Sequence, residues 1–185
     1  MAEELEAIGR EVHGCRSCPL WKTRNRAVPG EGPGYAKCML IGESPGADED
    51  RVGRPFVGRS GRYLNGVLEE HGLNRESLFI TGSVKCHPPG NRDPRRLELE
   101  SCRPYLDRQI RAISPRVIVL LGRIATRGFL GDMGMAEARE RIWIRGGTKF
   151  LPTYHPAAAM RFPSRGEHFR DDVRKLAGIL RRTND

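Results

Sequence analysis

Cysteine is the residue type in this chain whose spacing points most directly to chemistry. Cys15 and Cys18 form a C-x-x-C motif, which fits a metal site, a redox dithiol or chance. A thioredoxin-type dithiol is disfavoured, because that motif follows a strand and this one follows an expected helix. Cys86 and Cys102 join the pair if the loop between them folds back, and four thiolates hold either tetrahedral zinc or a 4Fe-4S cluster. Cys38 lies in an apolar run and is expected to be a small buried hydrophobe.

A second concentration of reactive side chains lies in the stretch IGESPGADEDRVGRPFVGRSG, residues 41–61. It places Glu43, Asp48, Glu49 and Asp50 close together, and its glycines and prolines predict tight turns before the chain becomes basic. A nucleotide-binding loop does not explain it, because the stretch is neither G-x-G-x-x-G nor a P-loop and its carboxylates would repel a pyrophosphate. It therefore raises the question of which site uses carboxylates, turns and arginines together.

The overall charge favours a polyanionic partner. The 185 residues carry a formal net charge of +9, and all but five of the 32 basic Lys and Arg residues are arginine, which suits bidentate phosphate contacts. A genome rich in G and C, or a warm habitat, explains an arginine bias equally well. No apolar run approaches the length of a membrane span, and the acidic N-terminus lacks the features of a secretion signal, so an intracellular, cytoplasmic protein is expected.

The elements that must position these residues follow an α/β pattern in one domain, residues 1–185. Short apolar runs alternate with helical patterns, which predicts a sheet with helices on both faces. Strands are expected over residues 37–41, 78–84 and 117–121, and helices over residues 3–12, 60–71, 95–113, 123–129 and 167–182. The segment RIWIRGGTKFLPTYH predicts two further strands joined by a Gly-Gly turn.

Four features taken in order carry a family resemblance. GESPGADEDRVGRPFVGRSG, VKCHPPGNRDP, YHPAAAMRFP and the four cysteines at positions 15, 18, 86 and 102 together resemble the family 4 uracil-DNA glycosylases, the iron-sulfur-containing branch of that superfamily. The resemblance runs from Cys15 to Arg161. It implies a three-layer α/β/α sandwich with a short central, mainly parallel sheet. It also implies a structural 4Fe-4S cluster held by those cysteines, and hydrolytic removal of uracil from DNA to leave an abasic site.

Such an enzyme extrudes the target nucleotide from the duplex, which calls for a basic surface, an aromatic platform and a wedge. Phe56 matches the family's stacking residue, with an ordinary core phenylalanine as the alternative. Met160 and Arg161 match the end of the second motif, where a loop enters the minor groove, so Met160 is a candidate wedge, with a core methionine as the alternative. Arg54 and Arg59, with the amides at the start of the following helix, are candidates for holding phosphates.

Breaking the bond between base and sugar develops positive charge on the sugar and negative charge on the base. His155 resembles the second-motif histidine, which would hydrogen-bond the uracil O2. Glu43 and Glu49 match first-motif positions where a carboxylate orients the attacking water or stabilises the oxocarbenium-like sugar. Asp48 and Asp50 are expected to cap loops or face solvent. Neither motif holds a lysine and Lys85 adjoins a cluster ligand, so a monofunctional glycosylase is expected rather than a Schiff-base enzyme.

Two positions depart from the family pattern. Gly82 stands where the family usually has an asparagine that reads the uracil edge, and loss of a bidentate amide removes roughly 1 to 3 kcal/mol of base discrimination. Ser44 stands where a small Ala or Gly is expected, and its hydroxyl can donate to a base or to water, or cap a turn. A pocket that accepts hypoxanthine or xanthine, a weak uracil enzyme, and a non-catalytic iron-sulfur DNA-binding protein therefore stay open as alternatives. The expected partner is DNA, bound by a monomer, with a sliding clamp or another repair protein as a further candidate.

Overall fold

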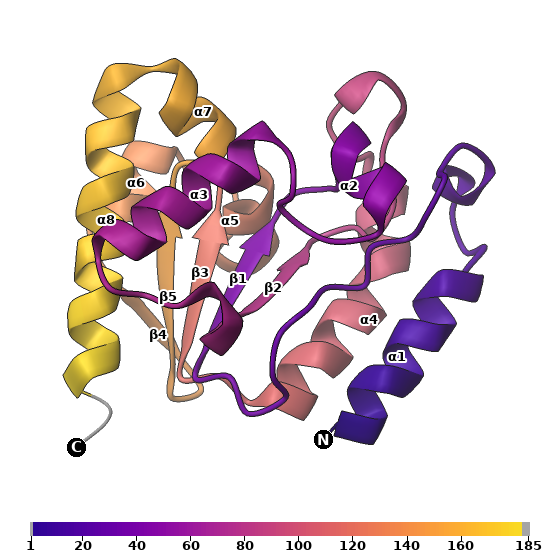
Figure 1. The fold of residues 1–185 in the computed structure, drawn as a ribbon, viewed down its shortest axis with the longest axis horizontal. Helices are drawn as coiled ribbons and strands as arrows, with labels where there is room; N and C mark the ends of the chain where they lie inside the picture. The colour runs from indigo at the N-terminus through magenta and orange to yellow at the C-terminus, as the bar shows by residue number, and fades with distance from the viewer. Residues whose placement is uncertain (1, 183–185) are drawn as a thin grey trace.

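The computed structural model describes residues 2–182, which form a single mixed sheet with helices on both faces (Figure 1). The strand order is β2-β1-β3-β5-β4, in which the first four strands run parallel and β4 runs antiparallel to β5. The strands are β1 (Cys38–Gly42), β2 (Phe79–Gly82), β3 (Val117–Leu121), β4 (Trp143–Arg145) and β5 (Thr148–Thr153). The predicted α/β fold class and three-layer arrangement are confirmed.

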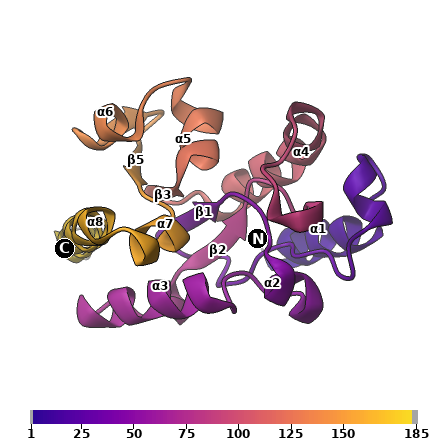
Figure 2. The same ribbon diagram turned by 90° about the horizontal axis from the view of Figure 1, so that it is seen from above.

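Helices cover the two faces as separate layers (Figure 2). The helices are α1 (Ala2–Gly14), α2 (Ala47–Val52), α3 (Arg59–Glu70), α4 (Arg96–Ile113), α5 (Arg123–Leu130), α6 (Met135–Arg139), α7 (Pro156–Arg161) and α8 (Pro163–Arg182). Leu40 and Val119 pack with side chains of α3 and α8 on one face. Met39 and Ile118 pack with α4 and α5 on the other, because successive strand side chains point to opposite faces. Helix α1 lies outside these layers, against α4.

The buried strands explain why the sequence shows continuous apolar runs there. Every residue of β1 and β3 is buried, as expected for parallel strands covered on both sides. Strand β2 ends at Gly82, two residues earlier than predicted. The predicted Gly-Gly turn joins β4 to β5, with Gly146 at φ 55° and Gly147 at φ 81°, the left-handed values that such a hairpin turn requires.

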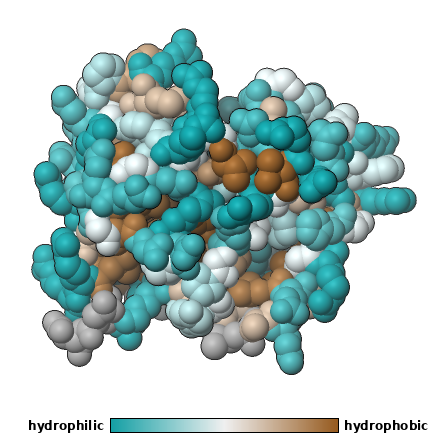
Figure 3. Space-filling view, viewed as in Figure 1, coloured by the Kyte–Doolittle hydropathy of each residue, from teal (hydrophilic) through white to brown (hydrophobic). Residues whose placement is uncertain are grey.

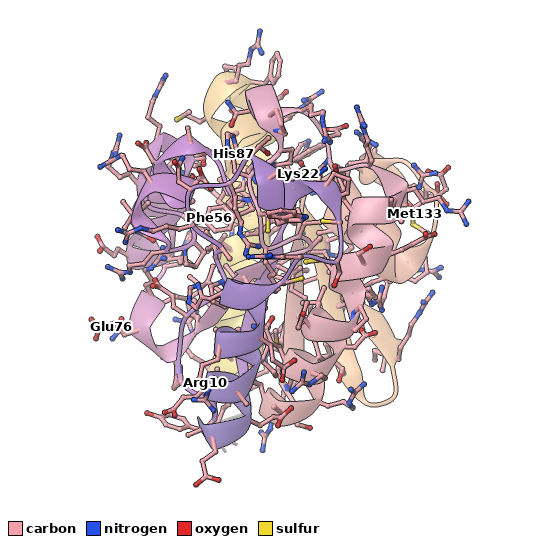
Figure 4. The ribbon with its side chains drawn as sticks, turned by 90° about the vertical axis from the view of Figure 1, so that its right-hand side faces the viewer. Arg10, Lys22, Phe56, Glu76, His87 and Met133 are labelled. Atoms are coloured by element: carbon pink, nitrogen blue, oxygen red, sulfur yellow. The ribbon has the colours of Figure 1, made fainter. Side chains whose placement is uncertain are left out.

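The carboxyl ends of the parallel strands meet at one edge of the sheet, and the loops that leave this edge carry the sequence motifs. In Figure 4, Phe56 and His87 lie toward this end of the molecule, whereas Arg10 and Glu76 lie toward the other end. The face seen in Figure 3 is mostly hydrophilic with smaller hydrophobic patches. Among the described residues, no helix has both the length and the apolar character needed to cross a membrane.

Candidate active site

A cavity of about 320 Å³ opens at the carboxyl edge of the sheet. It gathers most of the residues that the motifs singled out: Glu43, Ser44, Glu49, Phe56, Gly82 and His155. Met160 and Arg161 do not line it and lie exposed near the end of α7, so the alternative of a core methionine at position 160 is wrong. The cavity thus unites both motifs, while Met160 and Arg161 stand on the surface outside it.

Phe56 forms one wall, and two glycines clear the space for it. Its backbone has φ 52°, an uncommon value for a bulky residue. Arg75 holds this conformation by donating to the Phe56 carbonyl at 3.2 Å. A Cβ at Gly42 would lie 2.8 Å from the Phe56 ring, and one at Gly61 would lie 2.0 Å from the Phe56 carbonyl oxygen. The phenyl ring is therefore fixed by its surroundings.

His155 lies against Phe56 in the cavity lining, with ring centroids 5.8 Å apart and planes 30° apart. It is the N-cap of α7, and its Nδ1 accepts the Ala157 N–H at 3.2 Å. Burial lowers the pKa of His155 to about 4, against a smaller opposing effect of the Glu49 carboxylate. The imidazole is therefore neutral at neutral pH. Because Nδ1 accepts a hydrogen bond, its proton is on Nε2, which is free to donate.

Glu43 follows β1 and points at the start of α5. Its Oε1 accepts the Ile124 N–H at 3.2 Å, and a Cβ at Gly122 would lie 2.6 Å from that oxygen. Burial raises the pKa of Glu43, an effect that the Ile124 N–H opposes and the Asp93 carboxylate reinforces. Glu43 is thus a carboxylate with increased basicity inside the cavity.

Glu49 ties three loop segments together. Its Oε1 accepts the N–H groups of Val57 and Gly58 at 2.9 and 2.8 Å, and its Oε2 accepts the Gly46 N–H at 3.1 Å. The carboxylate therefore caps α2 and also accepts from the two residues that immediately precede α3, which begins at Arg59. Glu49 engages the Val57 and Gly58 amides that precede α3, and the expectation that amides of the first turn of α3 hold a phosphate stays a prediction.

The neighbouring charged residues have structural partners. Asp50 is 1% exposed and accepts from the Asn25 N–H at 3.0 Å, and Asp48 pairs with Arg51 on the surface, so both predicted assignments are confirmed. Arg54 donates to Glu31 at 2.7 Å, which engages its guanidinium within the protein. These contacts fix the loop that carries the first motif.

Gly82 and Asn91 complete the cavity lining. Gly82 ends β2, where a Cβ would lie 2.8 Å from the Val84 carbonyl oxygen. Asn91 was missed from the sequence, although a polar amide in the Pro- and Gly-rich segment HPPGNRDP was the available signal. It has φ 54°, and its Oδ1 lies 2.9 Å from the His87 Nε2.

The four motif cysteines line a second, very small cavity, of about 10 Å³, between the loop after α1 and helix α4. Cys86 lies in the loop beyond β2, which ends at Gly82. Among residues 2–182, no group of three or more His, Cys, Asp or Glu side chains is arranged to hold a single metal ion.

Donors already point at two of these sulfurs. Arg24 Nη1 donates to Cys86 Sγ at 3.0 Å, and the Lys85 N–H donates to Cys102 Sγ at 3.3 Å. Burial raises the pKa of Cys102 to about 11, so an unligated thiol there stays protonated. A set of four cysteines suits a metal-sulfur group, which binds each sulfur as a deprotonated thiolate. Cys38 lies outside this cavity, 1% exposed, with its pKa raised by burial to about 12, which confirms it as a buried hydrophobe.

Comparison with known proteins agrees with this geometry. Residues 29–177 match the model of the uracil DNA glycosylase superfamily. The chain is 43% identical to the Type-4 uracil-DNA glycosylase of Sulfurisphaera tokodaii, over 94% of this chain and 84% of that protein. It is 45% identical to the enzyme of the same name from Saccharolobus solfataricus, over 96% and 87%, and 41% identical to that from Archaeoglobus fulgidus, over 96% and 94%.

Proposed function

This chain belongs to the uracil DNA glycosylase superfamily, and from that premise we propose that it is a DNA repair glycosylase that excises uracil by hydrolysis and leaves an abasic site. The observation that carries the proposal is the cavity that Phe56 and His155 line together, with their ring centroids 5.8 Å apart. A flipped pyrimidine ring in this cavity would find an aromatic face, Phe56, and a hydrogen-bond donor, His155, side by side in the same wall.

His155 is proposed to stabilise the departing base. Its Nε2–H would donate to the uracil O2 as negative charge builds there, while the Ala157 N–H holds the ring in the required tautomer. Because burial lowers the pKa of His155 to about 4, the donor is a neutral imidazole over the whole physiological range of pH. No proton has to be gained or lost before the base departs.

The two glutamates are proposed to act on the sugar side. Glu43, whose pKa is raised by burial, would accept a proton from the attacking water as it adds to C1′. Glu49 has backbone donors on both oxygens, so its proposed contribution is a fixed negative charge that favours the oxocarbenium-like sugar. Lys85 is 1% exposed and cannot form a Schiff base with the sugar, which supports hydrolysis without strand cleavage.

Base recognition is proposed to use Phe56 for stacking, with Ser44 and the main chain at Gly82 as further contacts. Gly82 leaves no amide side chain at this position, but relatives named for uracil do not favour hypoxanthine or xanthine as the main substrate, nor a non-catalytic binder. Outside the cavity, Met160 and Arg161 are exposed on α7, where they suit a minor-groove wedge and a phosphate contact. The net charge of +9 supports DNA binding in general.

We propose that Cys15, Cys18, Cys86 and Cys102 hold a 4Fe-4S cluster with a structural role. When bound, the cluster would supply four metal-thiolate bonds that join the loop after α1 to the loop after β2 and to α4. The four thiols that line one cavity support this proposal. Anaerobic purification with iron and zinc analysis and ultraviolet-visible spectra tests it, and a colourless protein loaded with zinc would contradict it.

The remaining proposals concern the number of domains, the oligomeric state, the location in the cell and a protein partner. We infer one domain, a monomer, an intracellular location where DNA is available, and a sliding clamp as a repair partner. Size-exclusion chromatography with light scattering, alone and with a clamp, tests the monomer and the clamp together. A stable dimer, or no co-elution with the clamp, would contradict the respective proposal.

The function itself is tested with a labelled oligonucleotide that carries one uracil, single-stranded and paired with guanine or adenine. The wild-type protein is expected to release uracil and leave a site that breaks only after alkali. His155→Gln should lose at least about a hundredfold in rate while DNA affinity stays, because an oxyanion-type donor is lost. Excision that is equal in both proteins, or faster on hypoxanthine or xanthine than on uracil, would refute the assignment.

A further inference from the structure

Lys85 is a buried cation for which the proposed chemistry has no use. It is 1% exposed and ranks among the largest fully buried side chains of the described residues. Its ammonium donates to the Thr81 hydroxyl, to the Gly82 carbonyl at 3.0 Å and to the Gln109 Oε1 at 2.7 Å. An ammonium has three N–H donors, so these three oxygens satisfy it completely.

The acceptors of Lys85 belong to the substrate cavity and its support. Thr81 and Gly82 both line the cavity, and Thr81 Oγ1 donates in turn to the Pro29 carbonyl at 2.8 Å. Gln109 Nε2 donates to the same carbonyl at 2.8 Å. The ammonium is therefore the centre of a network that fixes the carboxyl end of β2 where the base would lie.

The main chain of the same residue contacts the four-cysteine cavity. Its N–H donates to Cys102 Sγ at 3.3 Å, and its carbonyl accepts the Val28 N–H at 2.7 Å. Val28 also lines the substrate cavity. Lys85 thus joins the two cavities within one residue. Its backbone contacts a sulfur, and its side chain lies under Thr81 and Gly82, which form the base-binding floor of the substrate cavity.

Burying an ammonium is unfavourable unless hydrogen bonds compensate, and a methionine of similar length would fill the same space without a charge. The charge has a geometric use, because a charged donor holds a carbonyl more strongly than a neutral one. The Gly82 carbonyl matters most here, since Gly82 has no side chain to fix it by packing.

We propose that Lys85 is a positioning residue for base excision, which holds Thr81 and Gly82 in the geometry of the base-binding floor and couples that floor to the four-cysteine cavity. The proposal rests on the proposed function. The positioning proposal predicts two results that a general loss of stability would not produce. The effect should be on the chemical step rather than on DNA affinity, and it should be local to the end of β2.

The test compares Lys85→Met with wild type in single-turnover uracil excision, in affinity for DNA carrying a tetrahydrofuran abasic-site analogue, and in amide hydrogen exchange. Excision should fall about tenfold or more while the dissociation constant changes by less than about threefold. The Ser83 and Val84 amides, which donate to the Gly42 and Glu43 carbonyls, should exchange faster than in wild type. Iron content should stay, because the Lys85 backbone N–H remains.

Leu130→Ala is the matched control, since it truncates a buried side chain at the far end of α5. It should lower the melting temperature without changing excision or the exchange of Ser83 and Val84. If Lys85→Met does not fold, Gln109→Met decides, because it removes one acceptor of the ammonium and should give a smaller loss of the same kind. Normal excision and normal exchange in the folded variants would overturn the proposal. A wild-type protein that releases no uracil would instead refute the function, and the exchange result would still test the positioning.

Discussion

Gly42→Ala is expected to disable the aromatic platform without touching any polar group of the site. Gly42 ends β1 and lines the cavity, and a Cβ there would lie 2.8 and 2.9 Å from two atoms of the Phe56 ring. Its φ lies outside the left-handed range, so alanine meets no backbone strain. The Phe56 main chain cannot retreat, because Arg75 holds its carbonyl and Gly61 lies against it. The ring itself must therefore move.

The expected size follows from what the ring contributes. Stacking of a base on an aromatic side chain is worth about 1 to 3 kcal/mol, which corresponds to a factor of about 5 to 150 in kcat/KM if all of it is lost. A displaced ring keeps part of that contact, so a loss of about tenfold is expected for Gly42→Ala and a larger one for Phe56→Ala. Because both changes act through one ring, the double variant should be no worse than Phe56→Ala alone.

The assay is uracil release under single-turnover conditions, with thermal unfolding measured in parallel. Gly66→Ala is the control, because this α3 glycine has no atom within 4 Å of the added Cβ and the change should leave excision unaltered and the helix slightly more stable. Normal excision by Gly42→Ala would refute the reasoning. So would losses that multiply fully in the double variant, since the two substitutions would then act on different features.

Three other predictions follow from the same geometry. Because the folded pKa of His155, about 4, lies below the unfolded value of 6.5, its contribution to stability is fully present above pH 6.5 and is lost as pH falls toward 4. Urea titrations of wild type and His155→Asn should therefore converge in that window by up to about 3 kcal/mol, and parallel curves would contradict the lowered pKa. Gly82→Ala should reduce uracil excision, because its Cβ would lie 2.8 Å from the Val84 carbonyl oxygen. An unchanged kcat/KM would show that the main chain here shifts to admit the Cβ without cost to catalysis. Cys102→Ala should lose bound iron and lower the melting temperature, measured by metal analysis and calorimetry, and a variant with full iron would exclude Cys102 as a ligand.

The long strands and helices could be predicted because the pattern of apolar residues shows which of their side chains are buried. Strands β1 and β3 are buried at every position and read as apolar runs, and α4 and α8 have periodic apolar faces. The short helices α2, α6 and α7 were missed. Helix α2 has six residues, four of them charged, and it depends on Glu49 and on Gly53 at φ 81° to begin and end. Such helices are stabilised by caps rather than by periodicity.

The membership of the site was predictable, but the contacts that fix it were not. Glu43, Phe56 and His155 were identified by their match to the motifs of the family, and the fold brings them to one cavity. Arg75 lies far along the chain from the Phe56 carbonyl that it holds, and no local pattern reveals such a contact. Lys85 looked unimportant beside a cysteine, because only the fold shows that its side chain reaches back under Gly82.

The floor of the cavity is made of main chain, which bears on the glycine at position 82. Beyond the paired strands, the Ser83 N–H donates to the Gly42 carbonyl at 2.9 Å and the Val84 N–H donates to the Glu43 carbonyl at 3.1 Å. The Ser83 hydroxyl donates to the same Gly42 carbonyl at 2.8 Å. These bonds extend the β1–β2 ladder into the site, so its shape does not depend on a side chain at position 82. A missing amide there removes one base contact and leaves the cavity intact, and selectivity then has to come from ring stacking on Phe56 and the donor on His155.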